Sequence, residues 1–89
     1  MEFGTVTRIG RSVRGWSQGE LAAAVTAANG RQMSRPTVTK LELGSREPRL
    51  PDAIVIADLL GFSLDVLKPG FRGAVDFAAP DGTVVRAAE

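Results

Sequence analysis

The chain contains no cysteine, no histidine and no tyrosine among its 89 residues. The lack of cysteine excludes disulfides and thiol nucleophiles, and the lack of cysteine and histidine together removes the usual ligands of zinc and haem. We therefore expect neither a metal nor a cofactor. Nucleophilic and acid–base catalysis also lose their commonest side chains, so we do not expect an enzyme.

No apolar run approaches the roughly 20 residues that a membrane-spanning helix needs, and the first residues lack the charged-then-apolar layout of a signal peptide. We therefore expect a cytoplasmic protein that has no membrane partner. Hydrophobic residues make up 44% of the chain and charged residues 24%, which is typical of a folded globular domain. A chain of this length can bury one modest core but not two.

The net charge of +1 conceals an uneven distribution of charge along the chain. Residues 8–49 hold eight basic and three acidic side chains, for a net charge of +5, whereas residues 50–89 have a net charge of −3. A basic segment of this kind is typical of a module that binds phosphates, because neutralising phosphate charge supplies most of the sequence-independent affinity for nucleic acid. Surface charge clusters are common, however, so sequence motifs are needed to decide whether this segment binds nucleic acid.

Apolar periodicity and helix-capping residues predict five helical segments in the first 70 residues. Ser17, with Glu20 three positions later, has the spacing of a capping box. Ser34 can cap the third segment, with Pro36 near its start, where the missing N–H costs nothing. The expected segments cover residues 5–14, 17–28, 34–43, 52–60 and 63–67.

The fourth segment is expected to begin with Asp52 as its capping residue. Pro48 and Pro51 should keep the linker before it extended, because proline restricts the residue that precedes it. Most apolar side chains of this segment should be buried, namely Ile54, Val55, Ile56, Ala57 and Leu60.

After residue 70 the pattern changes to the alternation of two short strands around the turn Ala79-Pro80-Asp81-Gly82. We expect residues 1–70 to form the helical domain and residues 71–89 a β-hairpin extension. An isolated hairpin is marginal in water, so its apolar face either covers the helical core or serves as a dimerisation element. The expected register pairs Val75 with Ala87, Asp76 with Arg86 and Phe77 with Val85, and the candidate dimer contacts are Val75, Phe77 and Val85.

Two stretches, RGWSQGELA at residues 14–22 and SRPTVTKLELGSREP at residues 34–48, resemble the helix-turn-helix family of phage Cro and CI repressors, the XRE-like regulators. The stretch IADLLGFSLDVL at residues 56–67 is similar to the fourth and fifth helices of that family. The resemblance implies a mainly α, five-helix, lambda-repressor-like domain, here followed by a C-terminal β-hairpin. It also implies that the partner is double-stranded DNA.

The resemblance assigns roles to individual side chains. Gln18 would bind a phosphate and buttress the reading helix, which begins near Ser34 and ends near Leu43. Side chains in the first turns of that helix would reach base edges, with Arg35 foremost because a guanidinium can donate two hydrogen bonds to guanine. The implied DNA-contact residues are Ser17, Gln18, Ser34, Arg35, Pro36, Thr37, Thr39, Lys40, Ser45 and Arg46.

Glu42 is an acidic residue on the expected reading helix, where an outward carboxylate would repel DNA. The resemblance implies that it points inward and forms a structural ion pair with Arg11 of the first helix. The apolar phase of that helix is shifted by one position relative to the family, which makes Arg8 a rival for the same role.

The loop at residues 26–32 is longer than in the family, which leaves the orientation of the reading helix open. Arg31 and Gln32 in this loop are further candidates for contact with the DNA backbone. Trp16 is expected to pack between helices. Leu43, where many relatives carry a polar residue, is either exposed or packed against the following linker.

These observations predict a sequence-specific transcriptional regulator, a repressor of the Cro/CI kind, that binds operator DNA as a homodimer through the major groove. The alternative is a protein-interaction module, in which the apolar hairpin and leucine-rich helices grip a protein partner as an antitoxin grips a toxin. A DNA footprint with twofold symmetry would favour the first hypothesis.

Overall fold

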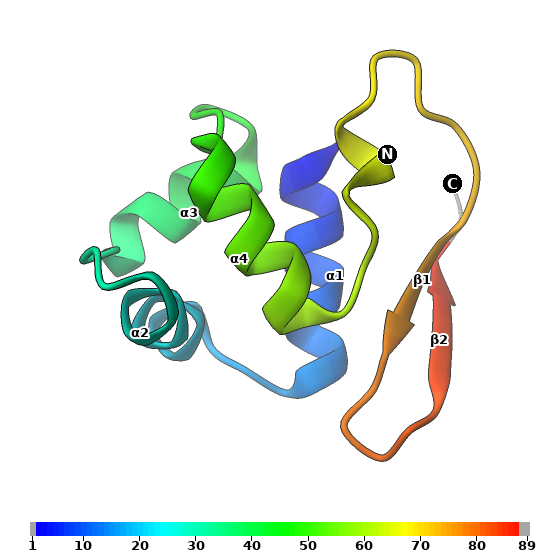
Figure 1. Cartoon of the computed structure of the whole chain (residues 1–89), viewed down its shortest axis with the longest axis horizontal. Coiled ribbons are helices and arrows are strands. Elements are labelled where there is room, and N and C mark those ends of the chain that lie inside the picture. Colours follow the sequence, from blue (N-terminus) through cyan, green and yellow to red (C-terminus); the bar gives the residue numbers. More distant parts are fainter. Residues whose placement is uncertain (1, 88–89) are drawn as a thin grey trace.

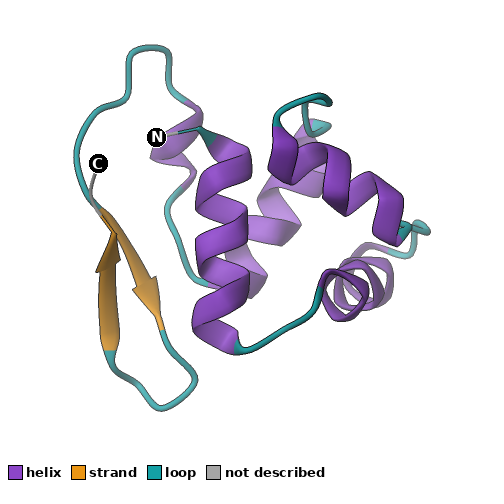
Figure 2. Cartoon of the chain, turned by 180° about the vertical axis from the view of Figure 1, so that it is seen from behind, coloured by secondary structure: helices purple, strands orange, loops and turns teal. Residues whose placement is uncertain are grey.

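The computed structural model describes residues 2–87 as four α-helices, a short 3₁₀ helix and a two-stranded antiparallel hairpin (Figure 1). The helices pack around one core, and the hairpin lies beside α1 at the edge of the helical bundle (Figures 1 and 2). Within residues 2–87, the helices are all too short or too polar to cross a bilayer. The elements are α1 (Phe3–Arg14), α2 (Gln18–Asn29), α3 (Arg35–Leu43), α4 (Leu50–Leu60), η1 (Leu64–Leu67), β1 (Val75–Ala78) and β2 (Val84–Ala87).

The mainly α fold with a C-terminal hairpin is confirmed, but the expectation of five α-helices was wrong. The fifth segment is η1, a 3₁₀ helix of four residues. Ser63 caps it and Pro69 follows closely, so the chain between them has room for a single turn. Val66 is its buried side chain, whereas Leu64 and Leu67 remain partly exposed.

Side-chain caps set the starts of α2 and α3. Ser17 Oγ accepts a hydrogen bond from the Glu20 amide at 3.0 Å, and the Glu20 carboxylate accepts one from the Ser17 amide at 2.9 Å. The hydrogen bonds from Ser17 lower the pKa of Glu20 below its ordinary value of 4.5. Ser34 Oγ accepts from the Thr37 amide and so begins α3. The predicted capping box and the predicted cap at Ser34 are both confirmed.

The start of α4 differs from the prediction, because the helix begins at Leu50 and Asp52 lies inside its first turn. Pro51 also lies in that turn, where its fixed φ fits a helix and its missing N–H needs no partner. The buried stripe of α4 is formed by Ala53, Ile56, Ala57 and Leu60. Ile54 is 46% exposed, because it lies about 100° around the helix from that stripe.

α2 ends within one residue of the expected position, at Asn29, and Gly30 stops it in the left-handed region. The loop between α2 and α3 therefore covers residues 30–34 and not 26–32, because the alanine-rich end of α2 has a high helix propensity and stays helical through Asn29. Thr26 Oγ1 accepts a hydrogen bond from the Met33 amide at 2.9 Å, and the Met33 side chain is buried. The remaining turn is therefore held against α2.

The hairpin covers the core of the same chain. Its register pairs Val75 with Ala87 and Phe77 with Val85, as predicted. The Phe77 side chain is fully buried and packs edge-on against Phe62 at a centroid distance of 5.7 Å. Val75 is only 3% exposed. These two candidate dimer contacts are thus occupied within the protomer and are not available to a second one while this packing lasts.

Candidate nucleic-acid interface

α3 presents one exposed face that combines cationic and apolar groups. Val38 and Leu41 are buried in the core on the opposite side of the helix. Pro36, Lys40 and Leu43 are exposed and follow each other at spacings of four and three residues, which places them on one face. Leu43 is 76% exposed, so the question left open by the sequence is settled in favour of exposure.

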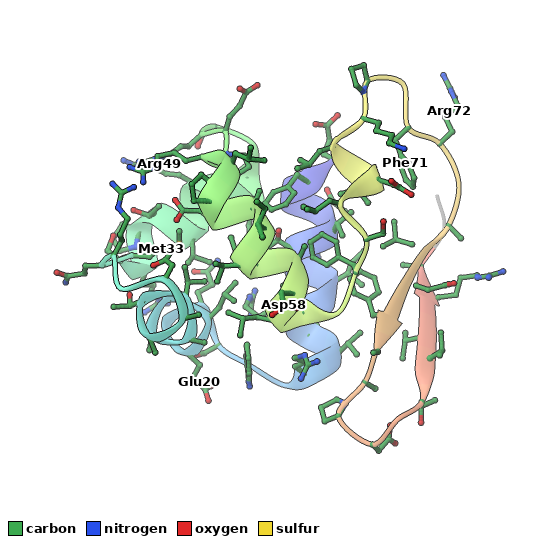
Figure 3. All side chains as sticks on the ribbon, viewed as in Figure 1. Glu20, Met33, Arg49, Asp58, Phe71 and Arg72 are labelled. Atoms are coloured by element: carbon green, nitrogen blue, oxygen red, sulfur yellow. The ribbon has the colours of Figure 1, made fainter. Side chains whose placement is uncertain are left out.

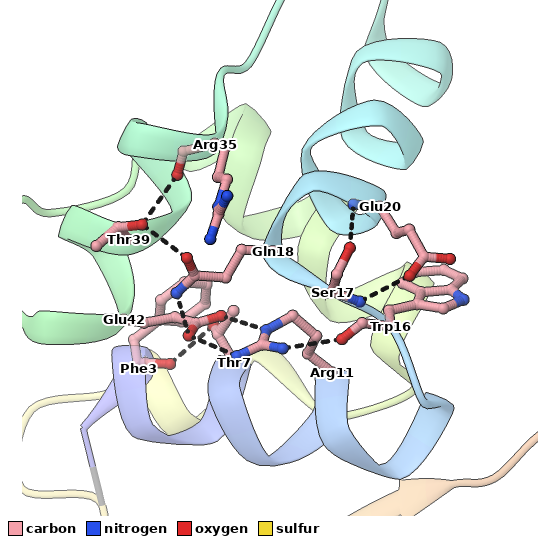
Figure 4. A network of polar contacts seen from close by, with 10 residues as sticks. All are labelled: Phe3, Thr7, Arg11, Trp16, Ser17, Gln18, Glu20, Arg35, Thr39 and Glu42. Carbon is pink, nitrogen blue, oxygen red and sulfur yellow. Dashed lines mark hydrogen bonds and ion pairs between the residues drawn. The ribbon is translucent and has the colours of Figure 1, made fainter.

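Arg35, the first residue of α3, is exposed at the edge of this face that adjoins α2. It lines a shallow surface hollow together with Gly19 and Ala23 of α2. Figure 4 shows its side chain on the side of α3 that faces the start of α2. The Arg35 guanidinium is thus exposed beside the start of α2.

A chain of hydrogen bonds links α3 to the start of α2 and to the last turn of α1 (Figure 4). Thr39 Oγ1 donates to Gln18 Oε1 at 2.7 Å, and Gln18 Nε2 donates to Glu42 Oε1 at 3.1 Å. Arg11 Nε and Nη2 donate to the two oxygens of Glu42 at 2.7 and 3.0 Å. Arg11 Nη1 also donates to the carbonyl of Trp16 at 2.8 Å. The network holds α3 at a fixed position relative to both helices.

The charge of Glu42 is satisfied inside this network. Its side chain is 3% exposed and that of Arg11 is 17% exposed. The hydrogen bond to Glu42 raises the pKa of Arg11 above its ordinary value. Arg8 is exposed on α1, so Arg11 and not Arg8 is the partner. The carboxylate therefore does not face a ligand that approaches α3.

Gln18 and Thr39 lie at the boundary between this network and solvent. Both side chains are half-buried, and both are engaged by other side chains of the network. The structure thus shows the buttressing part of the role that the resemblance assigned to Gln18. The Gln18 amide carries a second N–H besides the one that donates to Glu42.

The implied DNA-contact residues come together along α3 and at its two sides. Ser17 and Gln18 lie at the start of α2, and Ser45 and Arg46 lie in the loop after α3. Most of these side chains are exposed; three are half-buried, namely Gln18, Thr37 and Thr39.

The fold also brings together arginines that the sequence keeps apart. Arg31 of the α2–α3 turn, Arg46 of the following loop and Arg49 before α4 all line a small hollow of about 80 Å³. From the sequence, Arg31 and Arg46 are separate candidates for contact with the DNA backbone and Arg49 is only part of a basic segment, and no local motif places the three together. Figure 3 shows Arg49 at the end of the molecule that carries the α2–α3 turn, far from Arg72.

Comparison with known proteins identifies the family. Neither the curated proteins nor the solved structures include a significant match to the chain. The sequence model of the helix-turn-helix family matches residues 14–67, which is more than half of the chain and spans α2, α3, α4 and η1. That family comprises DNA-binding regulatory domains rather than typical enzymes. The chain therefore belongs to the XRE-type helix-turn-helix family of DNA-binding regulators of transcription.

Proposed function

We propose that this protein is a sequence-specific repressor that binds operator DNA as a homodimer, with α3 in the major groove. The observation that supports this most is that the acidic side chain of α3 is buried and paired while its basic side chains are exposed. Glu42 is the one acidic residue of that helix, and it is turned inward and neutralised by Arg11. Arg35 and Lys40 remain exposed, so the helix offers a cationic surface of the sort that nucleic acid attracts.

The exposed face of α3 supplies the base-reading groups. Arg35 donates two hydrogen bonds to guanine O6 and N7, the commonest specific contact in the major groove. Lys40, one turn further along, reaches the next acceptors on the base edges. Pro36 and Leu43 offer apolar contact to thymine methyl groups, which only the major groove displays. Thr39 contributes its methyl group beside them.

The residues around α3 position it on the phosphate backbone. Ser17 and Gln18 contact phosphates at the start of α2, where the helix dipole favours negative charge. Ser45 and Arg46 act in the same way after α3, and Ser34 and Thr37 lie at its N-terminal end. Backbone contacts of this kind set the register of the protein on DNA without selecting a sequence.

The hairpin offers a dimer contact through its free edge. The amide of Ala79 donates to the carbonyl of Thr83, which makes them a hydrogen-bonded pair. By the alternation of antiparallel pairs, Val84 and Arg86 turn their backbone N–H and C=O groups away from β1. Pairing of two β2 strands about a twofold axis would set the spacing of two reading helices, which is about 34 Å for adjacent half-sites.

The alternative, a protein-interaction module of the antitoxin type, is favoured by a different surface. Leu50 is 65% exposed and Leu67 is 37% exposed, and both border a hollow of about 620 Å³ that Phe71 also lines. An apolar surface next to a hollow is a typical place for a protein partner to bind. The hairpin itself is less suited, because Phe77 is buried in the core.

Selection of bound sequences from a random DNA pool at a stated salt concentration, with the mass of the complex measured in solution, tests the proposal. We expect a motif with twofold symmetry and a complex of two protomers on one duplex. The Arg35→Ala variant should relax the preference at one base step and leave the others in place. If the pool shows no enrichment with the wild-type protein, the proposal is wrong and the protein-interaction module is the better hypothesis.

A further inference from the structure

The arginine hollow is a surface depression that three arginines line. Arg31 comes from the α2–α3 turn, Arg46 from the loop after α3, and Arg49 from the residue directly before α4. The depression has a volume of about 80 Å³, which suits a small group rather than an extended ligand. Its other walls are formed by Gln32, Met33, Thr37 and Asp52.

Positive charge exceeds negative charge in the arginine hollow. Asp52 is the one carboxylate among the lining residues, and it already accepts a hydrogen bond from Asn29 at 3.0 Å and lies 3.8 Å from Arg49 Nε. The ion pairs formed within residues 2–87 do not include Arg31 or Arg46. Cationic side chains gathered around one small space repel one another, and an anion placed among them relieves this repulsion. The hollow is therefore suited to an anion with several acceptor oxygens.

The arginine hollow lies on the side of α3 that is away from Gln18. Thr39 faces α2, because its hydroxyl donates to Gln18. Thr37, two residues earlier, lines the hollow and is displaced from Thr39 by roughly 200° around the helix. The reading face of α3 is therefore bordered by Gln18 on one side and by the arginines on the other. A helix in the major groove has a phosphate backbone on each side, because the groove lies between the two strands.

We propose that the arginine hollow binds a backbone phosphodiester of the DNA strand opposite to the one that the start of α2 contacts. This inference rests on the proposed DNA-binding function and adds a second anchor to it. Arg31 and Arg49 hold the phosphate oxygens from two sides, and Arg46 neutralises the remaining charge. With anchors on both strands, α3 is fixed across the groove as well as along it.

The α2–α3 turn is built to present Arg31 at this place. The Arg31 amide donates to the side-chain oxygen of Asn29 at 2.9 Å, and the same side chain donates to Asp52 at the start of α4. Met33 anchors the other end of the turn in the core. The last residue of α2 and the turn after it thus have a function in this proposal, because Asn29 holds Arg31 on the α4 side of the reading helix.

Binding measured over a series of salt concentrations tests the inference. The proteins are the wild type, Arg31→Gln, Arg49→Gln and their double variant, with Arg72→Gln as the control, since Arg72 is exposed and far from the hollow. The DNAs are the selected operator and a random duplex. We expect Arg31→Gln and Arg49→Gln each to weaken binding to both DNAs equally, by on the order of tenfold. Each should also lower the slope of log affinity against log salt concentration by about one. Arg72→Gln should change neither quantity.

A second arm uses operator duplexes in which one phosphate at a time is replaced by an uncharged methylphosphonate. At one position beside the groove, the methylphosphonate should weaken binding by the wild type. The same substitution should not weaken binding by the double variant any further. If the wild type binds no duplex at all, the proposed function fails and the inference fails with it. If the wild type binds but Arg31→Gln and Arg49→Gln behave like Arg72→Gln, the inference alone is overturned. It is also overturned if inorganic phosphate shifts the amide resonances of the hollow while DNA binding by the variants stays unchanged, because the site then serves a free anion.

Discussion

Thr39 donates a 2.7 Å hydrogen bond to Gln18, so the middle of α3 is tied to the first residue of α2. Gln18 in turn donates a hydrogen bond to Glu42, and Glu42 accepts one from Arg11. The position of α3 therefore depends on a glutamine at its border with α2. If α3 binds DNA as proposed, we expect binding geometry and fold stability to be coupled at this residue.

The Gln18→Ala variant tests that coupling. We expect it to weaken binding to operator and random DNA by a similar factor, because it removes a positioning group and not a base contact. The free energy of unfolding should fall by about 1 kcal/mol, the usual net value of a side-chain hydrogen bond. Filter binding and urea denaturation measure the two effects. A loss confined to the operator would mean that Gln18 reads a base.

The Arg11–Glu42 pair should matter more for stability than for recognition. Arg11→Ala leaves the Glu42 carboxylate, which is 3% exposed, without its charged partner. We expect the free energy of unfolding to fall by about 3 kcal/mol, since breaking a buried pair from one side is costly. Arg8→Ala is the matched control on the same helix, and as a surface change it should cost less than about 0.5 kcal/mol. Equal effects of the two variants in chemical denaturation would contradict this account.

The capping box predicts a specific dependence of stability on pH. The pKa of Glu20 is lowered in the folded chain by its hydrogen bonds from Ser17, relative to an ordinary value of 4.5. Its contribution to stability is therefore complete above 4.5 and is lost as the pH falls through the lowered folded-state pKa. Glu20→Gln should show a smaller decrease of Tm over that acidic range than the wild type.

Glu47→Gln, a change in an exposed residue of the loop after α3, is the control for this measurement. Its Tm should fall on acidification as steeply as that of the wild type. If Glu20→Gln and the wild type lose stability in parallel, then the capping hydrogen bonds do not persist in solution.

The packing of the hairpin predicts a large effect at Phe77. Phe77→Ala removes a fully buried ring, and we expect the free energy of unfolding to fall by about 3 to 5 kcal/mol. Val84→Ala, on the same hairpin but 66% exposed, should change it by less than about 0.5 kcal/mol in the monomer. Thermal denaturation at low protein concentration separates this effect from dimerisation. A small effect at Phe77 would show that the hairpin does not cover the core in solution.

Leu43 offers a test of base reading that does not depend on charge. Leu43→Ala should leave stability almost unchanged, because the side chain is 76% exposed. If Leu43 contacts a thymine methyl group, replacing one operator thymine by deoxyuridine should weaken wild-type binding and have no further effect on Leu43→Ala. Competition binding with singly substituted duplexes measures this. A wild-type protein that tolerates deoxyuridine at every position would exclude the contact.

Much of the fold follows from the sequence because the signals act over a few residues. Ser17 and Glu20 define the start of α2, and Ser34 defines the start of α3, through hydrogen bonds that span three positions. The hairpin register follows from a short turn and from the alternation of Val75, Asp76 and Phe77. In each case the interacting groups are close in the chain, so their pattern can be recognised without knowing what packs against them.

Other features of the fold depend on contacts between segments that are far apart in the chain. The stripe of α4 that is buried includes Ala53 and leaves Ile54 outside, a choice between two apolar faces that only the packing against α1 and α2 decides.

In the candidate interface, too, some features follow from the sequence and others only from the tertiary structure. Residues 14–22 and 34–48 were enough to indicate a helix-turn-helix, whereas the burial of Phe77, the exposure of Leu43 and the shared hollow of Arg31, Arg46 and Arg49 arise from the tertiary structure alone. The physical reason is that burial and like-charge proximity depend on the distances between segments. Those distances are set by how the helices and the hairpin pack together, and no local pattern of residues encodes them.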